Sequence, residues 1–296
     1  MTGKTVLITG ATNGLGEVTA RELARMGATV VIVGRNAQKA KDVTASITAE
    51  TGNAKVDYIV SDLSVMAEIR DLADAFRAKY DRLDVLVNNA GMIFTSRELT
   101  PDGFEKTFAL NHLSYFMLTN LLMDMLRQTG TPEQKARVVN VSSSAHSFGK
   151  LDFSNLNGEK SYNAMGAYGV SKLCNILFTN ALARRLLAEE APVTVNSLHP
   201  GIVRTGFGKN NDGLLGTLTR AGTTVLQMFG LSAEKGAETQ IYLASSREVE
   251  GVSGQYFEKK KISRSNSVSN NEGIQERLWE VSGQMTGLHE AENVAG

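Results

Sequence analysis

The chain has 296 residues, 42% of them hydrophobic and 21% charged, so it can bury a sizeable core and is not expected to be disordered. Its 31 basic residues are balanced by 31 acidic ones, which argues against a nucleic-acid partner, because nucleic acids usually attract a basic protein. The single cysteine, Cys174, excludes an internal disulfide, and neither it nor the histidines have the spacing of metal ligands. We therefore expect no metal and a reducing, cytoplasmic environment.

Short β-branched runs alternate with amphipathic segments along the chain. Six strands are predicted in order, at 6–8, 29–33, 56–60, 83–87, 138–141 and 193–198. Apolar residues at helical spacing occupy the segments between them, most clearly at 18–26, 63–80 and 165–188. A further helix near 233–245 and a seventh strand at 253–257 follow. This rhythm predicts an α/β fold with a doubly wound, Rossmann-like parallel sheet of about seven strands and helices on both faces.

No linker interrupts this pattern, so residues 1–296 are predicted to form a single domain. The polar run 263–271 is predicted to be a loop or mobile segment before a last helix around Trp279. The first strand begins too close to Met1 to leave room for a signal peptide. No apolar stretch reaches the ~18 residues of a membrane-spanning helix, so we expect no transmembrane segment. Peripheral membrane contact is left open.

A glycine-rich turn follows the first predicted strand. Residues 9–16 read TGATNGLG, and an amphipathic helix starts near Glu17. Glycines let the backbone approach a pyrophosphate closely, while the helix N-terminus offers unpaired N–H groups and the positive end of its dipole. A turn without a ligand is the alternative, but the position after the first strand favours a dinucleotide site. The residues expected to contact the cofactor here are Gly10, Thr12, Asn13, Gly14, Leu15 and Gly16.

The end of the second strand indicates which dinucleotide is bound. A site that prefers NAD commonly has a carboxylate there, which binds the adenosine ribose and repels a 2′-phosphate. This chain has Gly34 and Arg35 instead. Glycine removes the repulsion, and the guanidinium of Arg35 can bind the phosphate through charge-assisted hydrogen bonds. We therefore predict that NADP(H) is preferred over NAD(H).

Tyr168 and Lys172 are four residues apart in a predicted helix, which puts a phenol and an ammonium on one face. The pKa of a phenol is about 10 and must fall for efficient proton transfer near neutral pH, and a nearby cation favours the phenolate. The pair predicts Tyr168 as a general acid or base whose pKa Lys172 lowers. The alternative for an isolated pair of this spacing is an exposed contact on a helix.

The spacing of the three glycines at 10, 14 and 16 resembles that of the short-chain dehydrogenase/reductase superfamily, and further motifs extend the resemblance over most of the chain. Asp62, with Leu63 beside it, matches the family's acidic residue that meets the adenine amine. The motif after the fourth strand matches one that supports the sheet and borders the cofactor. Its residues are Asn88, Asn89, Ala90 and Gly91.

The resemblance also implies a catalytic set of Asn111, Ser143, Tyr168 and Lys172. Ser143 would hydrogen-bond the substrate oxygen, Lys172 would hold the nicotinamide ribose, and Asn111 would help position a water-linked proton relay. The serines on both sides of Ser143 are alternatives. Ser143 is favoured because the family's catalytic serine is the second of the pair that closes the fifth strand.

The segment 199–205, HPGIVRT, matches the family's loop that meets the nicotinamide amide. The implied cofactor contacts in it are Pro200, Gly201, Val203 and Thr205. His199 is interpreted as structural. Tyr162 is interpreted as a pocket wall, because the residue four positions further on is a glycine and not a lysine.

The retinol-dehydrogenase-like branch of the superfamily is similar to this chain over residues 140–153, the insertion that follows up to Tyr168, and the tail motifs 253–257 and 277–280. This resemblance implies an oxidoreductase that interconverts an alcohol and a carbonyl on a lipophilic aldehyde, ketone or alcohol, with a homo-oligomer as one option. The apolar, glycine-containing segment 206–231 is interpreted as a mobile lid over the substrate, with an ordinary core helix as the alternative.

Two other functions stay open. An epimerase or dehydratase of related fold would share the Tyr168 and Lys172 pair, although such relatives carry another glycine pattern. A non-catalytic protein that senses NADP would keep the nucleotide loop and could lose the catalytic set. The intact catalytic set disfavours the sensor.

Overall fold

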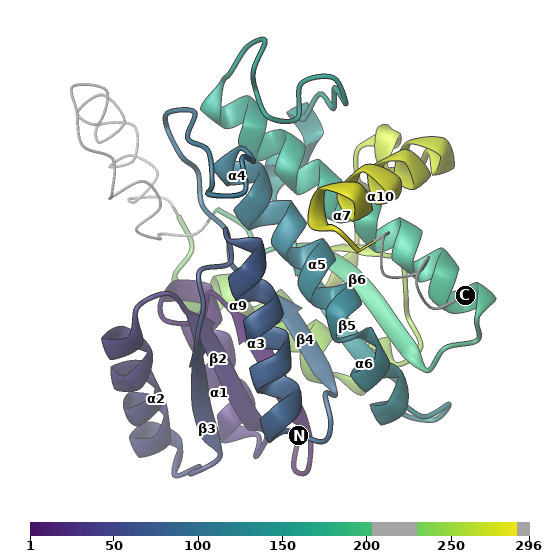
Figure 1. The fold of residues 1–296 in the computed structure, drawn as a ribbon. Coiled ribbons are helices and arrows are strands. Elements are labelled where there is room, and N and C mark those ends of the chain that lie inside the picture. The colour runs from purple at the N-terminus through teal and green to yellow at the C-terminus, as the bar shows by residue number, and fades with distance from the viewer. Residues whose placement is uncertain (203–229, 289–296) are drawn as a thin grey trace.

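The computed structural model describes residues 1–202 and 230–288, and within them the apolar runs join one sheet (Figure 1). Its eight strands lie in the order β3-β2-β1-β4-β5-β6-β7-β8. They are β1 (Thr5–Thr9), β2 (Thr29–Gly34), β3 (Val56–Val60), β4 (Val85–Asn88), β5 (Ala136–Val141), β6 (Val193–His199), β7 (Tyr256–Glu258) and β8 (Lys261–Ile262). Neighbouring strands are parallel except for the antiparallel pair β7 and β8.

Helices cover both faces of this sheet. The α-helices within the described ranges are α1 (Gly14–Arg25), α2 (Ala37–Thr51), α3 (Met66–Lys79), α4 (Lys106–Phe108), α5 (Ser114–Leu121), α6 (Met123–Thr129), α7 (Ala164–Ala188), α9 (Ala233–Ser245) and α10 (Glu272–Thr286). A π-helical turn, η1 (Ala109–Leu113), joins α4 to α5. Short 3-10 helices are η2 (Ser144–Phe148), η3 (Arg247–Val249) and η4 (Ser267–Asn270).

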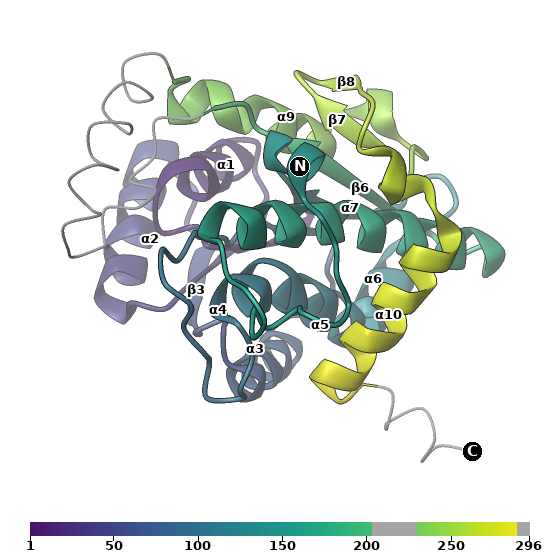
Figure 2. The ribbon, with the colours of Figure 1, turned by 90° about the horizontal axis from the view of Figure 1, so that it is seen from above.

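Strand residues alternate between two apolar layers. In β1, Val6 and Ile8 belong to the layer with α1, α2 and α9, whereas Leu7 belongs to the layer with α3, α5 and α7. Seen from above, α1 and α9 lie on one side of the sheet and α3 and α5 on the other (Figure 2). All five residues of β1 are buried, as expected for a central parallel strand covered on both faces.

The strand order places the functional end of the sheet. β1 pairs with β2 on one side and with β4 on the other, so the chain reverses its direction of winding between β1 and β4. In doubly wound sheets, ligands bind outside the carboxyl ends of the strands at such a reversal. The segments that follow β1, β4 and β5 therefore meet at one edge.

The six strands predicted first all form, and α9 matches the helix predicted at 233–245. The prediction of about seven strands misses β8, because its two residues are exposed and form no apolar run. The seventh strand begins later than predicted, since Gly254 turns the chain with a φ of 72°. The polar run 263–271 contains η4, and Asn180 donates a hydrogen bond to the carbonyl of the buried Ser269. It is thus more ordered than a plain loop.

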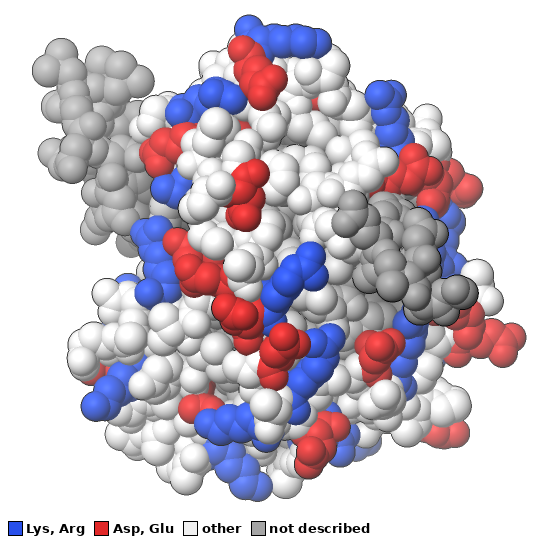
Figure 3. Space-filling model, in the orientation of Figure 1, with Lys and Arg blue, Asp and Glu red and all other residues white. Residues whose placement is uncertain are grey.

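Residues 203–229 and 289–296 lie outside the described residues, and with them most of the proposed lid at 206–231. Among the helices that are described, none is long and apolar enough to span a membrane. Basic and acidic side chains are interspersed on the face drawn in Figure 3, as the balanced composition leads one to expect. The cytoplasmic location stays a prediction.

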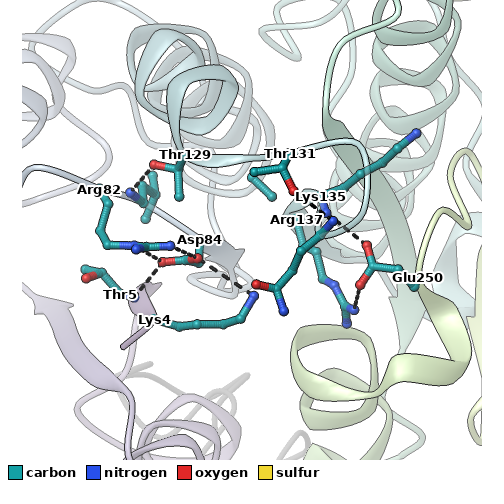
Figure 4. Close-up of polar contacts among 12 residues, drawn as sticks. Lys4, Thr5, Arg82, Asp84, Thr129, Thr131, Lys135, Arg137 and Glu250 are labelled. Carbon is teal, nitrogen blue, oxygen red and sulfur yellow. Dashed lines mark hydrogen bonds and ion pairs between the residues drawn. The ribbon is translucent and has the colours of Figure 1, made fainter. Parts of the chain in front are cut away.

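Ionic contacts gather at the amino-terminal edge of the sheet, opposite the functional end (Figure 4). The carboxylate of Asp84 accepts hydrogen bonds from the Thr5 N–H at 2.9 Å and from Arg82 at 2.7 and 2.8 Å. Nearby, Arg137 donates to Glu250 at 2.8 Å. The first group joins the starts of β1 and β4, and the second joins the start of β5 to the segment after η3.

Candidate active site

The glycine turn after β1 is held in a conformation that few other residues could adopt. Gly10 and Gly14 have φ angles of 63° and 54°. A Cβ on Gly10 would lie 2.7 Å from Ala90 Cα, and one on Gly16 would lie 2.6 Å from the Gly10 carbonyl oxygen. Asn13 precedes α1 without capping it through its side chain. The first N–H groups of α1 are therefore suited to an external anion, and the turn fits a dinucleotide pyrophosphate.

The segment after β4 is fastened to this turn. Thr9 Oγ1 accepts hydrogen bonds from the N–H groups of Asn89 at 2.9 Å and Ala90 at 3.0 Å. In return, Asn89 Nδ2 donates to the carbonyls of Thr9 at 2.8 Å and Gly10 at 3.1 Å. Thr9 was missed by the sequence reasoning, although its place at the end of the strand before the first glycine was a signal.

The adenosine end of the predicted site lies at the ends of β2 and β3, whose residues Gly34 and Val60 are paired. Arg35 is exposed there, and its guanidinium makes no hydrogen bond or ion pair with the rest of the described chain. Asp62 Oδ1 accepts hydrogen bonds from Ser64 N at 2.9 Å and Ser64 Oγ at 2.7 Å. Three further predicted contacts lie close by: Leu63 is buried, Thr12 lies against Gly34, and Leu15 is in the first turn of α1.

Close packing of α7 against η2 brings the predicted catalytic residues together. A Cβ on Gly169 would lie 2.9 Å from both the Ala145 carbonyl oxygen and the Phe148 ring, so only glycine permits this approach. Ser143 precedes η2, and its side chain hydrogen-bonds that of Tyr168. The structure thus juxtaposes the serine and tyrosine that the sequence singled out.

Lys172 lies behind the phenol. Its ammonium is 5.7 Å from the centre of the Tyr168 ring and donates a 2.9 Å hydrogen bond to the carbonyl of Val141. Burial raises the pKa of Tyr168 to about 12, and the hydrogen bond with Ser143 opposes that rise. Burial also lowers the pKa of Lys172 to about 7. Burial is thus the largest cause of both pKa shifts, and the lowering of the phenol pKa by Lys172 stays a prediction.

Asn111 lies in the π-helical turn η1, a type of irregularity that is frequent at functional sites. Its Oδ1 accepts from Met92 N at 2.9 Å, and its Nδ2 donates to Met92 O and Ser171 Oγ, each at 3.0 Å. A Cβ on Gly91 would lie 3.2 Å from Lys172 Nζ and 3.3 Å from Asn111 Oδ1. The absence of a side chain at position 91 thus keeps space in front of the lysine.

The loop after β6 completes the described part of the site. Pro200 and Gly201 follow β6, and Gly201 has a φ of 88°. His199 Nδ1 accepts a hydrogen bond from Ser144 N at 3.2 Å, in agreement with a structural role next to Ser143. The other two predicted contacts, Val203 and Thr205, lie outside the described residues.

Tyr162 does not join the catalytic group. Its hydroxyl donates to the Phe94 carbonyl at 2.9 Å, and the ring lines a cavity of about 340 Å³, so it is a pocket wall as predicted. The sequence reasoning missed Tyr115 on α5, whose ring centre is 5.4 Å from Lys172 Nζ. Its hydroxyl is buried and has no hydrogen-bond partner in the described part of the chain. Its position four residues after Asn111, on the same helical face, was the available signal.

The comparison with known proteins agrees with this geometry. A model of the short chain dehydrogenase family matches residues 4–213. Human polyprenol dehydrogenase is 41% identical over 286 residues, covering 96% of this chain and 86% of the relative. Human retinol dehydrogenase 14 is 42% identical over 301 residues, covering 97% of this chain and 88% of the relative.

Solved structures give the same result. An uncharacterized protein from Mycobacterium paratuberculosis superposes with a TM-score of 0.77 at 32% identity, covering 97% of this chain and 94% of the other. The RhlG/NADP active-site complex of Pseudomonas aeruginosa has a TM-score of 0.67 at 26% identity, covering 87% and 94%. The chain belongs to the short chain dehydrogenase family, in its retinol-dehydrogenase-like branch. Its class of reaction is oxidoreduction at a CH–OH group with a nicotinamide cofactor.

Proposed function

We propose that the protein is an NADP(H)-dependent oxidoreductase that interconverts a lipophilic alcohol and its aldehyde or ketone. The observation that carries this proposal is the hydrogen-bonded pair of Ser143 and Tyr168, with Lys172 behind the phenol, at the same sheet edge as the glycine turn. When bound, the nicotinamide would supply or accept the hydride.

The residues of the chain divide the remaining work. Ser143 would donate a hydrogen bond to the substrate oxygen, and Tyr168 would transfer the proton at that oxygen. Burial raises the pKa of Tyr168 to about 12, so near neutral pH the phenol carries the proton that it would donate to a carbonyl oxygen. Lys172 would hold the nicotinamide ribose in the space that Gly91 leaves open, and Asn111 would support the proton relay.

The choice of NADP(H) is supported by Arg35, an exposed guanidinium without a partner in the described chain, in place of the carboxylate of NAD-preferring sites. The glycine turn, Asp62, Asn89 and the loop at Pro200 would hold the rest of the dinucleotide. The lipophilic substrate is supported by relatives named as polyprenol and retinol dehydrogenases. A gain in kcat/KM as the alkyl chain of test aldehydes is lengthened would agree with it, and a flat series would contradict it.

The catalytic assignment is tested by Tyr168→Phe. We expect turnover of an aldehyde with NADPH to fall by about 10²–10⁴-fold, the usual contribution of positioned acid-base catalysis, with little change in the Kd of NADPH. Tyr242→Phe is the matched control, because it removes a phenol hydroxyl on α9 that hydrogen-bonds Glu248 away from the catalytic residues. Near-normal turnover of Tyr168→Phe would remove Tyr168 from the mechanism.

A further inference from the structure

Two side chains of α7 share one acceptor at the end of β5. The carbonyl of Val141 accepts a hydrogen bond from Lys172 Nζ at 2.9 Å and another from Asn175 Nδ2 at 3.2 Å. A backbone carbonyl has two lone pairs, so these two donors together use its full capacity. The position of the Lys172 ammonium thus depends on a carbonyl that Asn175 also holds.

Asn175 is itself fixed from the other side. Its Oδ1 lies 3.3 Å from His112 Nδ1, and His112 Nε2 lies 3.0 Å from Ser282 Oγ on α10. All three side chains are completely buried. Burial lowers the pKa of His112 to about 4, so the ring is neutral near pH 7 and only one of its nitrogens carries a proton.

The hydrogen-bond partners of His112 determine which of its ring nitrogens carries the proton. An amide oxygen can only accept, so Nδ1 of His112 donates to Asn175, and Nε2 accepts the hydroxyl proton of Ser282. This direction keeps the NH₂ end of the Asn175 amide toward Val141. The reversed amide would place its oxygen against the Val141 carbonyl oxygen, where the two acceptors would repel.

We propose that His112, Asn175 and Ser282 are positioning residues that hold Lys172 in place through the shared carbonyl of Val141. The chain of hydrogen bonds starts on α10, which packs across α7 in both ribbon views (Figures 1 and 2). The last helix of the described chain is therefore part of the support of the catalytic centre. The expected effect on kcat rests on the proposed function. The dependence of the Lys172 ammonium on these hydrogen bonds does not.

A measurable consequence concerns the protonation of Lys172. The titratable groups that face its ammonium are Tyr168 on α7 and Tyr115 on α5, with ring centres 5.7 and 5.4 Å away. A carbonyl that already accepts the Asn175 N–H is a weaker acceptor for the ammonium. Removing the amide should strengthen the bond to the charged form and raise the pKa of Lys172.

The experiment follows the pKa of Lys172 by NMR of ¹³C-labelled lysine side chains in the cofactor-free protein, with Lys172→Arg to assign the signal. We expect Asn175→Leu to raise that pKa by about half a pH unit or more, and Ser282→Ala to raise it by a smaller amount. In assays with NADPH, kcat should fall roughly threefold or more in Asn175→Leu. Thr179→Val is the control, because Thr179 lies about two helical turns beyond Lys172 and hydrogen-bonds the Asn140 amide and the Asn175 carbonyl.

The control should lose thermal stability while the pKa of Lys172 stays the same. An unchanged Lys172 pKa in Asn175→Leu, or an equal shift in Thr179→Val, would overturn the proposal. If Asn175→Leu fails to fold, Ser282→Ala decides alone, since it removes only a hydroxyl, and an unchanged pKa then rejects the proposal. A failed Tyr168→Phe test would refute the proposed function and leave the NMR result standing.

Discussion

Gly169, the residue after Tyr168, packs so closely on the carbonyl of Ala145 that the two elements carrying Tyr168 and Ser143 are in direct contact. A Cβ at this position would also meet the Phe148 ring at 2.9 Å. Because backbone and ring atoms block it, α7 and η2 would have to separate to accommodate a methyl group.

We therefore predict that Gly169→Ala lowers kcat by about tenfold or more, since even small displacements of reacting groups are costly. The free energy of unfolding should fall by roughly 1–3 kcal/mol. Gly166→Ala is the matched control in the same helix, because its Cβ would be 3.5 Å from the nearest atom of Asn163. Steady-state kinetics and urea unfolding measure both effects, and equal activity of the two variants would refute the prediction.

Arg35 gives a prediction on cofactor choice. Arg35→Ala should weaken NADPH binding by roughly 1.5–3 kcal/mol, the range for hydrogen bonds to charged groups, and leave NADH binding nearly unchanged. Lys41→Ala, which removes another exposed cation from α2, should affect both cofactors little. Titration of each cofactor into the three proteins measures the difference. Equal losses for NADPH and NADH in Arg35→Ala would mean that Arg35 does not bind the 2′-phosphate.

Local patterns revealed the parts of the fold and site that depend on neighbours in sequence. The glycine turn and the pair Tyr168 and Lys172 could be predicted because their short spacings have a direct physical consequence: close approach of the backbone to a pyrophosphate, and two side chains on one face of a helix. Short β-branched runs predicted six of the strands. The direction of the Tyr168 pKa shift could not be predicted the same way. It is governed by burial, which depends on the packing of α7 against η2 and not on the spacing to Lys172.

The support behind Lys172 was beyond sequence reasoning for a related cause. His112 and Asn175 are 63 residues apart, and His112 and Ser282 are 170 residues apart. In the sequence, each of these residues is an ordinary polar residue of a helical segment, and nothing indicates that it contacts the others. Only the packing of η1, α7 and α10 against one another brings them together.

Asp84 offers a test of stability that is separate from activity. Its carboxylate accepts the N–H of Thr5 and two hydrogen bonds from Arg82 at the amino-terminal edge of the sheet. Asp84→Asn should lower the free energy of unfolding by roughly 1–3 kcal/mol, because a buried acceptor of charged donors is replaced by a weaker one. The values of kcat and KM should not change, since the site is at the opposite edge.

Asp81→Asn is the control for Asp84→Asn. Asp81 is exposed and has no hydrogen bond or ion pair with another described residue, so its replacement should cost little. Urea unfolding and steady-state assays on both variants provide the comparison. Equal stability of the two variants would show that the contacts of the Asp84 carboxylate in Figure 4 contribute nothing measurable.

His112 predicts how stability depends on pH. Its pKa falls from 6.5 to about 4 on folding, because the buried ring cannot be charged at low cost. Between these two values the unfolded chain binds a proton that the native protein does not, so stability rises with pH across this window. Above pH 6.5 His112 is neutral in both states and does not lower the free energy of unfolding. As the pH falls toward 4, the unfolded chain takes up the proton and the free energy of unfolding decreases, by about 3 kcal/mol at most.

Lys172 adds a slope of the same sign in a different window, because its pKa falls from 10.5 to about 7. The two groups can therefore be separated. In His112→Phe, which keeps a ring between Phe108 and Phe178, we expect a lower stability at neutral pH but a flatter dependence below pH 6.5. The slope above pH 7 should remain as in the wild type. Urea unfolding at closely spaced pH values measures the slope of stability with pH in both ranges, below pH 6.5 and above pH 7. The same acid slope in the variant and the wild type would show that His112 is not the group that takes up the proton on unfolding.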